Sequence, residues 1–222
     1  MGKLIVIEGL DGSGKSTQEN LLRQKLAEKG IHVNSIKLPN YDDPACEPVK
    51  MYLAGRFGSN PSDVNAYAAS SFFAVDRFVS YNCYWKEKYL SGEVFIADRY
   101  TTSNAYHQLT KTPESEWDTY LEWLEDFEYK KMGIPKPDSV IYLDMPIDVS
   151  QKLMSGRYHG DESKKDIHEK DVEYLNSCRK AADYSCSKLG WTRILCAENG
   201  EPLPIEKISE KVFEAVSPAL GL

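Results

Sequence analysis

The feature that most constrains the fold of this chain is a glycine-rich stretch close to its first residue. It matches the pattern G-x-x-x-x-G-K-[ST] at every fixed position and consists of Gly9, Leu10, Asp11, Gly12, Ser13, Gly14, Lys15 and Ser16. The apolar, β-branched run at residues 4–7 precedes it and suits a buried parallel strand. From Thr17 to Lys29, apolar residues recur at the spacing of one helix face. The order of strand, glycine-rich turn and helix predicts a loop that binds phosphate groups.

The chemistry of this loop follows from its backbone. Glycines let several backbone N–H groups converge on an anion, and the helix N-terminus adds a partial positive charge. We expect the loop and Thr17 to bind a nucleoside triphosphate. Lys15 would reach the outer phosphates, and the Ser16 hydroxyl would take one place on Mg²⁺. The alternative, a glycine–serine turn that binds nothing, is disfavoured by the flanking strand and helix.

Bulk properties limit the class of protein. A length of 222 residues supports one substantial core, so we expect one domain over residues 1–222. A net charge of −7 argues against a nucleic-acid-binding surface, and no apolar run has the roughly 18 residues of a membrane span. The five cysteines show no metal-ligand spacing, and reduced thiols in a cytoplasm are their simplest interpretation.

Strands and helices alternate along the rest of the chain. Short apolar or alternating runs predict four further strands at residues 31–36, 93–97, 140–144 and 191–196. Helical patterns cover residues 47–55, 64–89, 101–110, 115–132, 147–154, 171–189 and 204–216. The charges of the acidic segment 115–132 are expected to form a solvated face. This alternation predicts a three-layer α/β/α fold with a five-stranded parallel sheet.

Charged and polar residues follow the predicted strands at one edge of the sheet, where ligands bind in parallel α/β folds. The loop at residues 38–44 follows the second strand, and Asp98 ends the third. An acidic residue in that position is typical of a Walker-B carboxylate, and a turn with a salt bridge is the alternative. Phe73 and Arg77 share a helix face, which suits stacking on a planar base together with hydrogen bonding. Taken alone, such a pair more often reflects core packing with a surface arginine.

Together these segments resemble thymidylate kinases. The resemblance runs from Lys3 to about Leu195 and rests on Asp11, Pro39-Asn40-Tyr41, Phe73 with Arg77, and Asp98-Arg99-Tyr100 followed by Ser103-Asn104. Members of that family transfer the γ-phosphoryl group of ATP to dTMP, which forms dTDP for dTTP biosynthesis. The resemblance therefore implies a P-loop NTPase fold, ATP and Mg²⁺ as cofactors, dTMP as acceptor, and a cytoplasmic homodimer.

The resemblance also implies roles for individual residues. Four would contact the nucleoside of dTMP: Asp11 at the sugar 3′-hydroxyl, Phe73 stacked on thymine, Arg77 at a thymine carbonyl and Asn104 at the base edge. Three would surround its sugar and phosphate: Arg99, which also contacts the transferring group, with Tyr41 and Tyr100. Catalysis would depend on Lys15, Arg99, Arg157 and Asp98, the last through the Mg²⁺ water shell.

The sequence departs from the family pattern in two places. Many relatives have P-E-R where this chain has Pro39-Asn40-Tyr41, so an arginine contact to the dTMP phosphate is absent from that loop. Some relatives have an arginine where this chain has Gly12, and a lid cation supplies the charge in relatives with glycine. We expect a mobile lid over about residues 156–168. Its candidate cations are Arg157, our first choice, Lys164 and Lys165.

Two other functions remain open at this stage. A deoxynucleoside kinase of the same fold would phosphorylate a neutral hydroxyl and would need a catalytic base, for which Glu8 is poorly placed. A nucleotide-dependent switch or binding protein would use the loop without transfer, but no guanine-specifying N-K-x-D is present. The aromatic residues of segment 81–89 suit either a dimer interface or the core of one chain.

Overall fold

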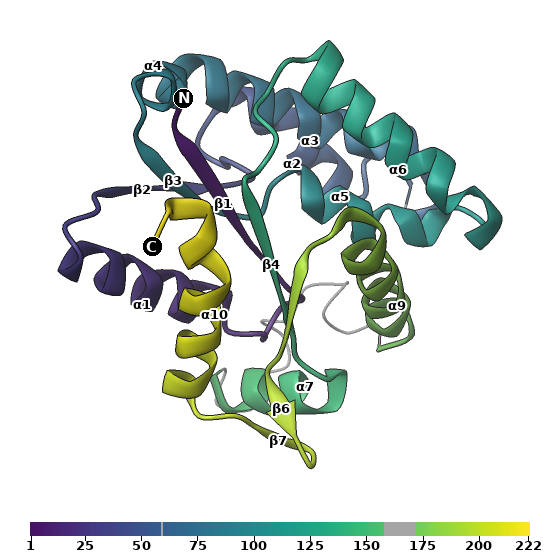
Figure 1. Ribbon diagram of the computed structural model, residues 1–222. Coiled ribbons are helices and arrows are strands. Elements are labelled where there is room, and N and C mark those ends of the chain that lie inside the picture. The colour runs from purple at the N-terminus through teal and green to yellow at the C-terminus, as the bar shows by residue number, and fades with distance from the viewer. Residues whose placement is uncertain (59, 158–171) are drawn as a thin grey trace.

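The central sheet has the predicted five parallel strands. The computed structural model describes the chain except residues 59 and 158–171 and the side chains of residues 61 and 155–157. The strands are β1 (Lys3–Glu8), β2 (Val33–Lys37), β3 (Val94–Asp98), β4 (Ser139–Asp144) and β5 (Thr192–Leu195), in the order β2-β3-β1-β4-β5 (Figure 1). Every neighbouring pair is parallel. The carboxyl ends of β1 and β3, which carry the predicted motifs, therefore lie side by side.

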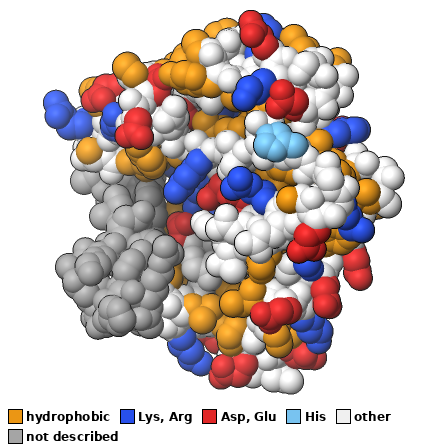
Figure 2. All heavy atoms as spheres, turned by 90° about the vertical axis from the view of Figure 1, so that its left-hand side faces the viewer, with side chains coloured by type: hydrophobic (Ala, Val, Ile, Leu, Met, Phe, Trp, Pro, Cys, Tyr) orange, Lys and Arg blue, Asp and Glu red, His pale blue; other side chains and the backbone are white. Residues whose placement is uncertain are grey.

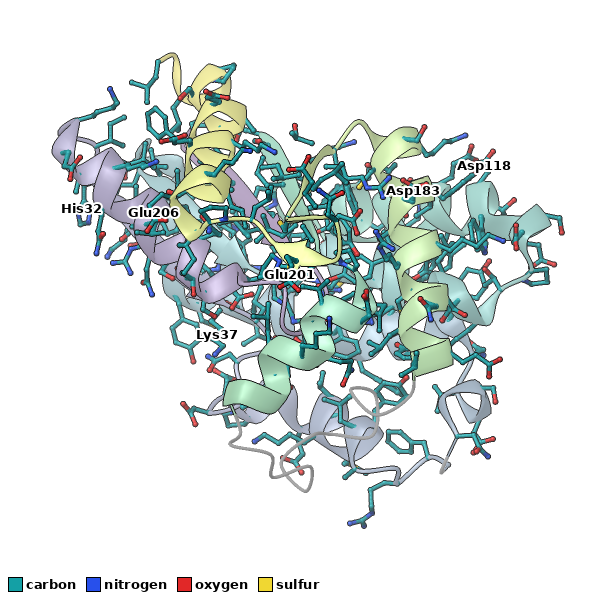
Figure 3. All side chains as sticks on the ribbon, turned by 90° about the horizontal axis from the view of Figure 1, so that it is seen from below. His32, Lys37, Asp118, Asp183, Glu201 and Glu206 are labelled. Atoms are coloured by element: carbon teal, nitrogen blue, oxygen red, sulfur yellow. The ribbon has the colours of Figure 1, made fainter. Side chains whose placement is uncertain are left out.

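Helices cover both faces of this sheet. On one face, α1 (Lys15–Glu28) packs against α10 (Ile205–Leu220). The other side holds α2 (Glu47–Leu53), α3 (Ala66–Ser80), α4 (Lys86–Leu90), α5 (Thr101–His107), α6 (Trp117–Glu125) and α9 (Val172–Leu189) (Figure 1). Seen from below, α7 (Ile147–Arg157) and the β6–β7 hairpin that carries Glu201 lie in front of the sheet (Figure 3). The predicted three-layer α/β/α fold is confirmed.

The central strand β1 contributes to two cores. Ile5 and Ile7 belong to the apolar cluster under α1 and α10, and Leu4 and Val6 to the cluster on the opposite face. All four side chains are fully buried, and the burial of each stabilises the fold by about 1.5–3 kcal/mol. Because both faces are covered, the strand is a continuous apolar run instead of an alternating one.

Several element boundaries differ from the sequence-based expectation. The helical pattern over residues 64–89 is α3, a π-helical segment at Tyr81–Trp85, and α4. The pattern over residues 115–132 likewise includes α6 and a π-helical segment at Asp126–Lys131. The short hairpin of β6 (Ala197–Glu198) and β7 (Glu201–Pro202) was not predicted. Its turn residues Asn199 and Gly200 have φ angles of 53° and 78°, the conformation that favours Asn-Gly in tight hairpins.

The surface is of mixed charge. On the face shown in Figure 2, Lys and Arg side chains are interspersed with Asp and Glu, in keeping with the net charge of −7. Among the described residues of that face, the basic side chains form no extended patch of the kind that binds nucleic acid. None of the helices in the described residues is both long enough and apolar enough to cross a bilayer.

A buried carboxylate at the end of β4 connects this strand with α9 and β5. The side chain of Asp144 is fully buried, and its Oδ1 lies 2.7 Å from Nε of Arg179 on α9. Its Oδ2 lies 2.5 Å from Nη2 of Arg193 on β5. Burial raises the pKa of Asp144, but hydrogen bonds from both arginines outweigh it, and the pKa falls below its ordinary value. These two ion pairs hold α9 and the edge strand β5 against β4.

We expect Asp144→Asn to lower the free energy of unfolding by about 3 kcal/mol at neutral pH, measured by urea denaturation. This is the lower end of the range for a broken buried pair, because both arginines are about one-third exposed. Since folding lowers the pKa of Asp144, its contribution is complete above the unfolded-state pKa of about 3.9 and is lost as the pH falls through the folded-state pKa. The difference between wild type and variant should therefore shrink only below about pH 4.

The control is Asp183→Asn. Asp183, labelled in Figure 3, also pairs with Arg193 but is exposed on α9. An exposed pair contributes less than about 1 kcal/mol, so this variant should resemble wild type. Equal losses in the two variants would contradict the role of the buried carboxylate.

Candidate active site

The glycine-rich loop lies between β1 and α1, as its motif predicts. Gly14 precedes the helix with a φ angle of 90°, and α1 begins at Lys15, two residues earlier than expected. Gly12 has a φ angle of 79°, and a Cβ there would lie 3.0 Å from the carbonyl oxygen of Ser150 and from Cγ of Met154. Because α7 packs so closely on the loop, a side chain at position 12 would require α7 to shift by a few tenths of an ångström.

Lys15 is buried within the loop. Its Nζ donates to the carbonyl oxygens of Gly9 and Leu10, at 2.9 and 3.2 Å, and lies 3.5 Å from Oδ1 of Asp11. Burial, followed by the nearby Arg99, lowers the pKa of this ammonium group. A buried cation held by the oxygens of its own loop gains a stronger partner when a phosphate binds there.

Asp11 connects this loop to Arg99, the residue that follows β3. Nη2 of Arg99 lies 2.7 Å from Oδ1 of Asp11, and its Nη1 lies 3.2 Å from Nε2 of His107. Burial raises the pKa of Asp11, but Arg99 and then Lys15 outweigh it and hold the pKa far below its ordinary value. Arg99 has a φ angle of 69°, a strained conformation for a side chain of this size. Its guanidinium group is thereby directed to Asp11 at the mouth of the loop.

Asp98 ends β3, beside the glycine-rich loop. It is buried, and its Oδ1 has no hydrogen-bond partner among the described residues; the same holds for Oγ of Ser13. Buried polar atoms without partners are uncommon, so this oxygen is available to a water or a cation. The described residues include no group of three or more His, Cys, Asp or Glu side chains that could hold a metal by themselves. A metal ion at Asp98 would therefore need water and phosphate oxygens as further ligands, which is how Mg²⁺ is commonly bound.

Glu8, the last residue of β1, is fully buried and has many hydrogen-bond donors around it. Its Oε1 accepts from the backbone N–H of Tyr100 and from the hydroxyl of Thr102, at 3.2 and 2.6 Å. Its Oε2 accepts from the hydroxyls of Ser103 and Tyr106, at 2.9 and 2.7 Å. Glu8 therefore fixes the first turns of α5 and is not a base directed at a substrate.

A pocket of about 150 Å³ lies beside Asp11 and Arg99. It is lined by all seven residues that the sequence predicts for the acceptor: Asp11, Tyr41, Phe73, Arg77, Arg99, Tyr100 and Asn104. The sequence did not single out several further residues of its wall, which are Tyr52, Asp76, His107, Gln108 and Tyr174. The pocket therefore unites motifs from four separate parts of the chain.

The inner end of this pocket depends on a buried ion pair that the sequence did not reveal. Nε and Nη2 of Arg77 each lie 2.6 Å from an oxygen of Glu128, and both side chains are buried. Nδ2 of Asn104 donates to the carbonyl oxygen of Ser70 at 3.3 Å and lies 3.4 Å from Oε1 of Glu128. Glu128 lies in the segment whose charges were expected to be solvated, and for this residue the expectation was wrong. Its carboxylate fixes Arg77 and Asn104, and Nη1 of Arg77 donates in addition to the carbonyl oxygen of Tyr100 at 3.3 Å.

Aromatic side chains form the walls of the pocket. The ring of Phe73 meets Tyr52 edge-on, with centroids 6.1 Å apart, and Tyr41 is half-exposed at the rim. Tyr100 is fully buried, and its hydroxyl donates to the carbonyl oxygen of Pro135 at 3.0 Å. The hydroxyl of Tyr100 is therefore engaged with the protein, which leaves its other atoms to line the pocket. Asp76 accepts the backbone N–H of residue 40 at 3.2 Å and so anchors the loop that carries Tyr41.

Part of the predicted site lies outside the described residues. This concerns most of the predicted lid at about residues 156–168, with Lys164 and Lys165, and the side chain of Arg157. The backbone of Arg157 ends α7, which lies directly over the glycine-rich loop.

Comparison with known proteins identifies the family. The family model described as thymidylate kinase matches residues 7–208. The chain belongs to the thymidylate kinase family. A thymidylate kinase of Mycobacterium tuberculosis is 30% identical over 173 residues, which cover 77% of this chain and 79% of that protein. A probable thymidylate kinase of Thermococcus gammatolerans is 34% identical over 161 residues, 71% of this chain and 72% of the relative. The resemblance inferred from the motifs is confirmed.

The buried Arg77–Glu128 pair yields a stability prediction. Glu128→Gln should lower the free energy of unfolding by about 3–5 kcal/mol, because it leaves a buried guanidinium group without its counter-charge. The double variant Arg77→Met, Glu128→Met removes both charges and should recover most of this loss, as measured by urea denaturation.

Glu125→Gln is the control for Glu128→Gln. Glu125 pairs with the exposed Lys136, so its loss should cost less than about 1 kcal/mol. A double variant as unstable as Glu128→Gln would show that the uncompensated charge of Arg77 is not the cause of the lost stability.

Proposed function

We propose that this enzyme transfers the γ-phosphoryl group of ATP to dTMP in a Mg²⁺-dependent reaction that gives dTDP for dTTP biosynthesis. The observation that carries the proposal is the position of the pocket. Asp11 belongs both to the phosphate-binding loop and to the pocket wall, and it is paired with Arg99. A donor phosphate on the loop and an acceptor in the pocket would therefore meet at these two side chains.

On the donor side, the glycine-rich loop and the first turn of α1 bind the ATP phosphates. The N–H groups at the start of α1 and the ammonium group of Lys15 neutralise the charge of the triphosphate, with Ser16 and Thr17 exposed beside them. Ser16 and Asp98 are the residues proposed to hold Mg²⁺ and its water shell. The unpartnered Oδ1 of Asp98 fits this assignment. When bound, Mg²⁺ neutralises charge that develops on the phosphate oxygens.

On the acceptor side, the pocket suits a pyrimidine deoxynucleotide. Phe73 offers a ring face for stacking on thymine, and Arg77 offers N–H groups for a base carbonyl. Asn104, held by its amide nitrogen, presents its oxygen to the base edge. Arg99 binds the dTMP phosphate, and Tyr41 covers the sugar from the rim. The names of the curated relatives support the choice of dTMP over other monophosphates.

Phosphoryl transfer requires that its two substrates are aligned and that their negative charges are neutralised. The attacking oxygen of dTMP is already anionic at neutral pH, so no strong base is required, whereas two polyanions must approach each other. Lys15 and Arg99 offset this repulsion, and Arg157 from the lid is proposed to assist them.

The structure weighs against the two alternatives. A deoxynucleoside kinase would need a free base, and the nearby buried carboxylate of Glu8 is already occupied by protein donors. A switch that only binds nucleotide has no use for an acceptor pocket that shares Asp11 with the phosphate loop. The absence of disulfides among the five cysteines agrees with a cytoplasmic enzyme.

The experiment that tests this function is a substrate panel. Purified protein with ATP and Mg²⁺ should phosphorylate dTMP in preference to AMP, GMP and CMP, measured as coupled ADP release. Lys15→Met and Arg99→Met should each reduce the rate roughly a thousandfold, as expected when a charge central to phosphoryl transfer is removed. Preference for another monophosphate, or ADP release that does not depend on dTMP, would refute the proposal.

We further propose that the enzyme is a homodimer formed through α3. Of the four aromatic residues in segment 81–89, Tyr81, Trp85 and Tyr89 pack in the core of the same chain. Tyr84 is 59% exposed and remains compatible with an interface. Exposed apolar side chains on α3, namely Tyr67, Val75 and Phe78, are also available.

The dimer proposal predicts a mass twice the 25.2 kDa of one chain in sedimentation equilibrium. Val75→Glu should shift the mass toward the monomer, because it places a charge in the apolar contact. Lys86→Glu, an exposed change beyond α3, is the control and should leave the mass unchanged. A wild-type mass near 25 kDa would refute the dimer.

A further inference from the structure

Asp11 and His107 contact different nitrogens of the Arg99 guanidinium group. Nη2 of Arg99 lies 2.7 Å from Oδ1 of Asp11, and Nη1 lies 3.2 Å from Nε2 of His107. The hydroxyl of Tyr106 is farther from Nη1, at 3.4 Å, and donates its own proton to Glu8. His107 is therefore the closer of these two partners of Nη1. Together with Asp11 it fixes the direction of the guanidinium group.

The contact between Arg99 and His107 defines which ring nitrogen carries the proton. A guanidinium group has only N–H donors, so Nε2 of His107 must be the acceptor and is unprotonated. The proton of the neutral ring is then on Nδ1, which lies 3.2 Å from the hydroxyl of Tyr174 and 3.6 Å from Sγ of Cys178. Both of these groups can accept a hydrogen bond, so the surroundings of Nδ1 suit this tautomer.

The ring of His107 is held by its neighbours. It belongs to the last residue of α5, and its centroid lies 4.5 Å from that of the Tyr106 ring. Tyr174 of α9 packs on it with a centroid distance of 6.3 Å and an interplanar angle of 21°. Tyr106 is fully buried, and α9 packs against α5. Because both aromatic neighbours belong to packed helices, they keep the imidazole ring in the orientation that directs Nε2 at Arg99.

A neutral acceptor suits an arginine that must bind phosphate. Asp11 already offsets part of the positive charge of Arg99. A second carboxylate at Nη1 would offset more of that charge and would repel an approaching phosphate. An unprotonated imidazole nitrogen fixes Nη1 without adding negative charge. The guanidinium group has further N–H donors, which remain for the phosphate.

We propose that His107 is a positioning residue of the phosphoryl-transfer site, and that its Nε2 holds the guanidinium group of Arg99 in the orientation that binds the acceptor phosphate. This inference rests on the proposed function, in which Arg99 contacts the phosphate of dTMP. His107 also lines the acceptor pocket, so a direct contact with the nucleotide is the alternative that the experiments must separate.

Two substitutions restore an acceptor at one ring position or the other. Counted in bonds from Cβ, the side-chain oxygen of Gln corresponds to Nε2 of His, and that of Asn corresponds to Nδ1. His107→Gln should keep kcat/KM for dTMP within about threefold. His107→Asn should reduce it roughly tenfold, because only this variant leaves Nη1 of Arg99 without its acceptor. The KM for ATP should stay within about twofold in both variants.

The matched control is His32→Asn, the same change at an exposed position before β2 that is labelled in Figure 3. It should leave kcat/KM for dTMP unchanged. Equal losses in His107→Gln and His107→Asn, or a larger loss in His107→Gln, would overturn the proposal, because the imidazole would then act through its bulk or through Tyr174.

A double-mutant cycle separates positioning from direct contact with the nucleotide. In an Arg99→Met background, His107→Asn should change the residual rate less than about twofold, since the side chain that His107 positions is already absent. A loss of roughly tenfold in that background would show that His107 acts without Arg99, and would refute the positioning role.

Nitrogen-15 NMR of the imidazole ring tests the contact without measuring activity. In wild-type protein labelled at histidine, the resonances of His107 are identified by their loss in His107→Gln. At neutral pH they should show a protonated Nδ1 and an unprotonated Nε2. A proton on Nε2 would place two donors face to face, which is incompatible with the proposed contact.

The two proposals fail in different ways. If wild type does not phosphorylate dTMP, the proposed function fails, and the NMR measurement still tests the contact between His107 and Arg99. If wild type phosphorylates dTMP and His107→Asn does so equally well, only the role of His107 is refuted.

Discussion

The ion pair between Asp11 and Arg99 is the contact on which the site depends. It joins the loop after β1 to the residue after β3, and these strands are neighbours with Ile7 opposite Asp98. Parallel pairing therefore brings both loops to one point, and the ion pair fixes their separation. Nζ of Lys15 lies 3.5 Å from the same oxygen, Oδ1 of Asp11, so a single carboxylate holds two cations where phosphate groups are expected to meet. Neutralising that carboxylate would leave the buried Lys15 and the partly buried Arg99 to repel each other.

Buried carboxylates elsewhere serve the framework. Glu8 fixes the start of α5, Glu128 fixes Arg77 and Asn104, and Asp144 fixes α9 and β5. Each is surrounded by donors from the protein, which offset the cost of burying its charge. Oδ1 of Asp98 and Oε1 of Gln108 are buried without such donors among the described residues. Buried oxygens without a partner among the described residues also occur in the framework, at Gln18 of α1 and Ser209 of α10, so an unpartnered atom does not by itself mark a ligand site.

Much of the fold and the site could be predicted because their signals are local. Five apolar runs located the five strands, and the glycine spacing located the phosphate loop. The spacing of Phe73 and Arg77 placed both on one face, and both line the pocket. The misses have non-local causes. Glu128 lies in an acidic segment that looked solvated, and only packing against α3 and α5 buries it. The Asn199-Gly200 turn carried a hairpin signal, but two-residue strands are too short to show a pattern.

The sequence by itself determined the order of strands and helices, the phosphate-binding loop and the family, because each depends on residues close together in the chain. Tertiary structure decided which charges are buried and with what partners. Arg77 meets Glu128 across 51 positions and Asp11 meets Arg99 across 88. It also decided how closely α7 packs on position 12, where a Cβ would lie 3.0 Å from the carbonyl oxygen of Ser150. Sequence periodicity shows which face of a helix a residue occupies. The energy of a charged side chain depends on the groups packed against that face, and only the folded chain determines those groups.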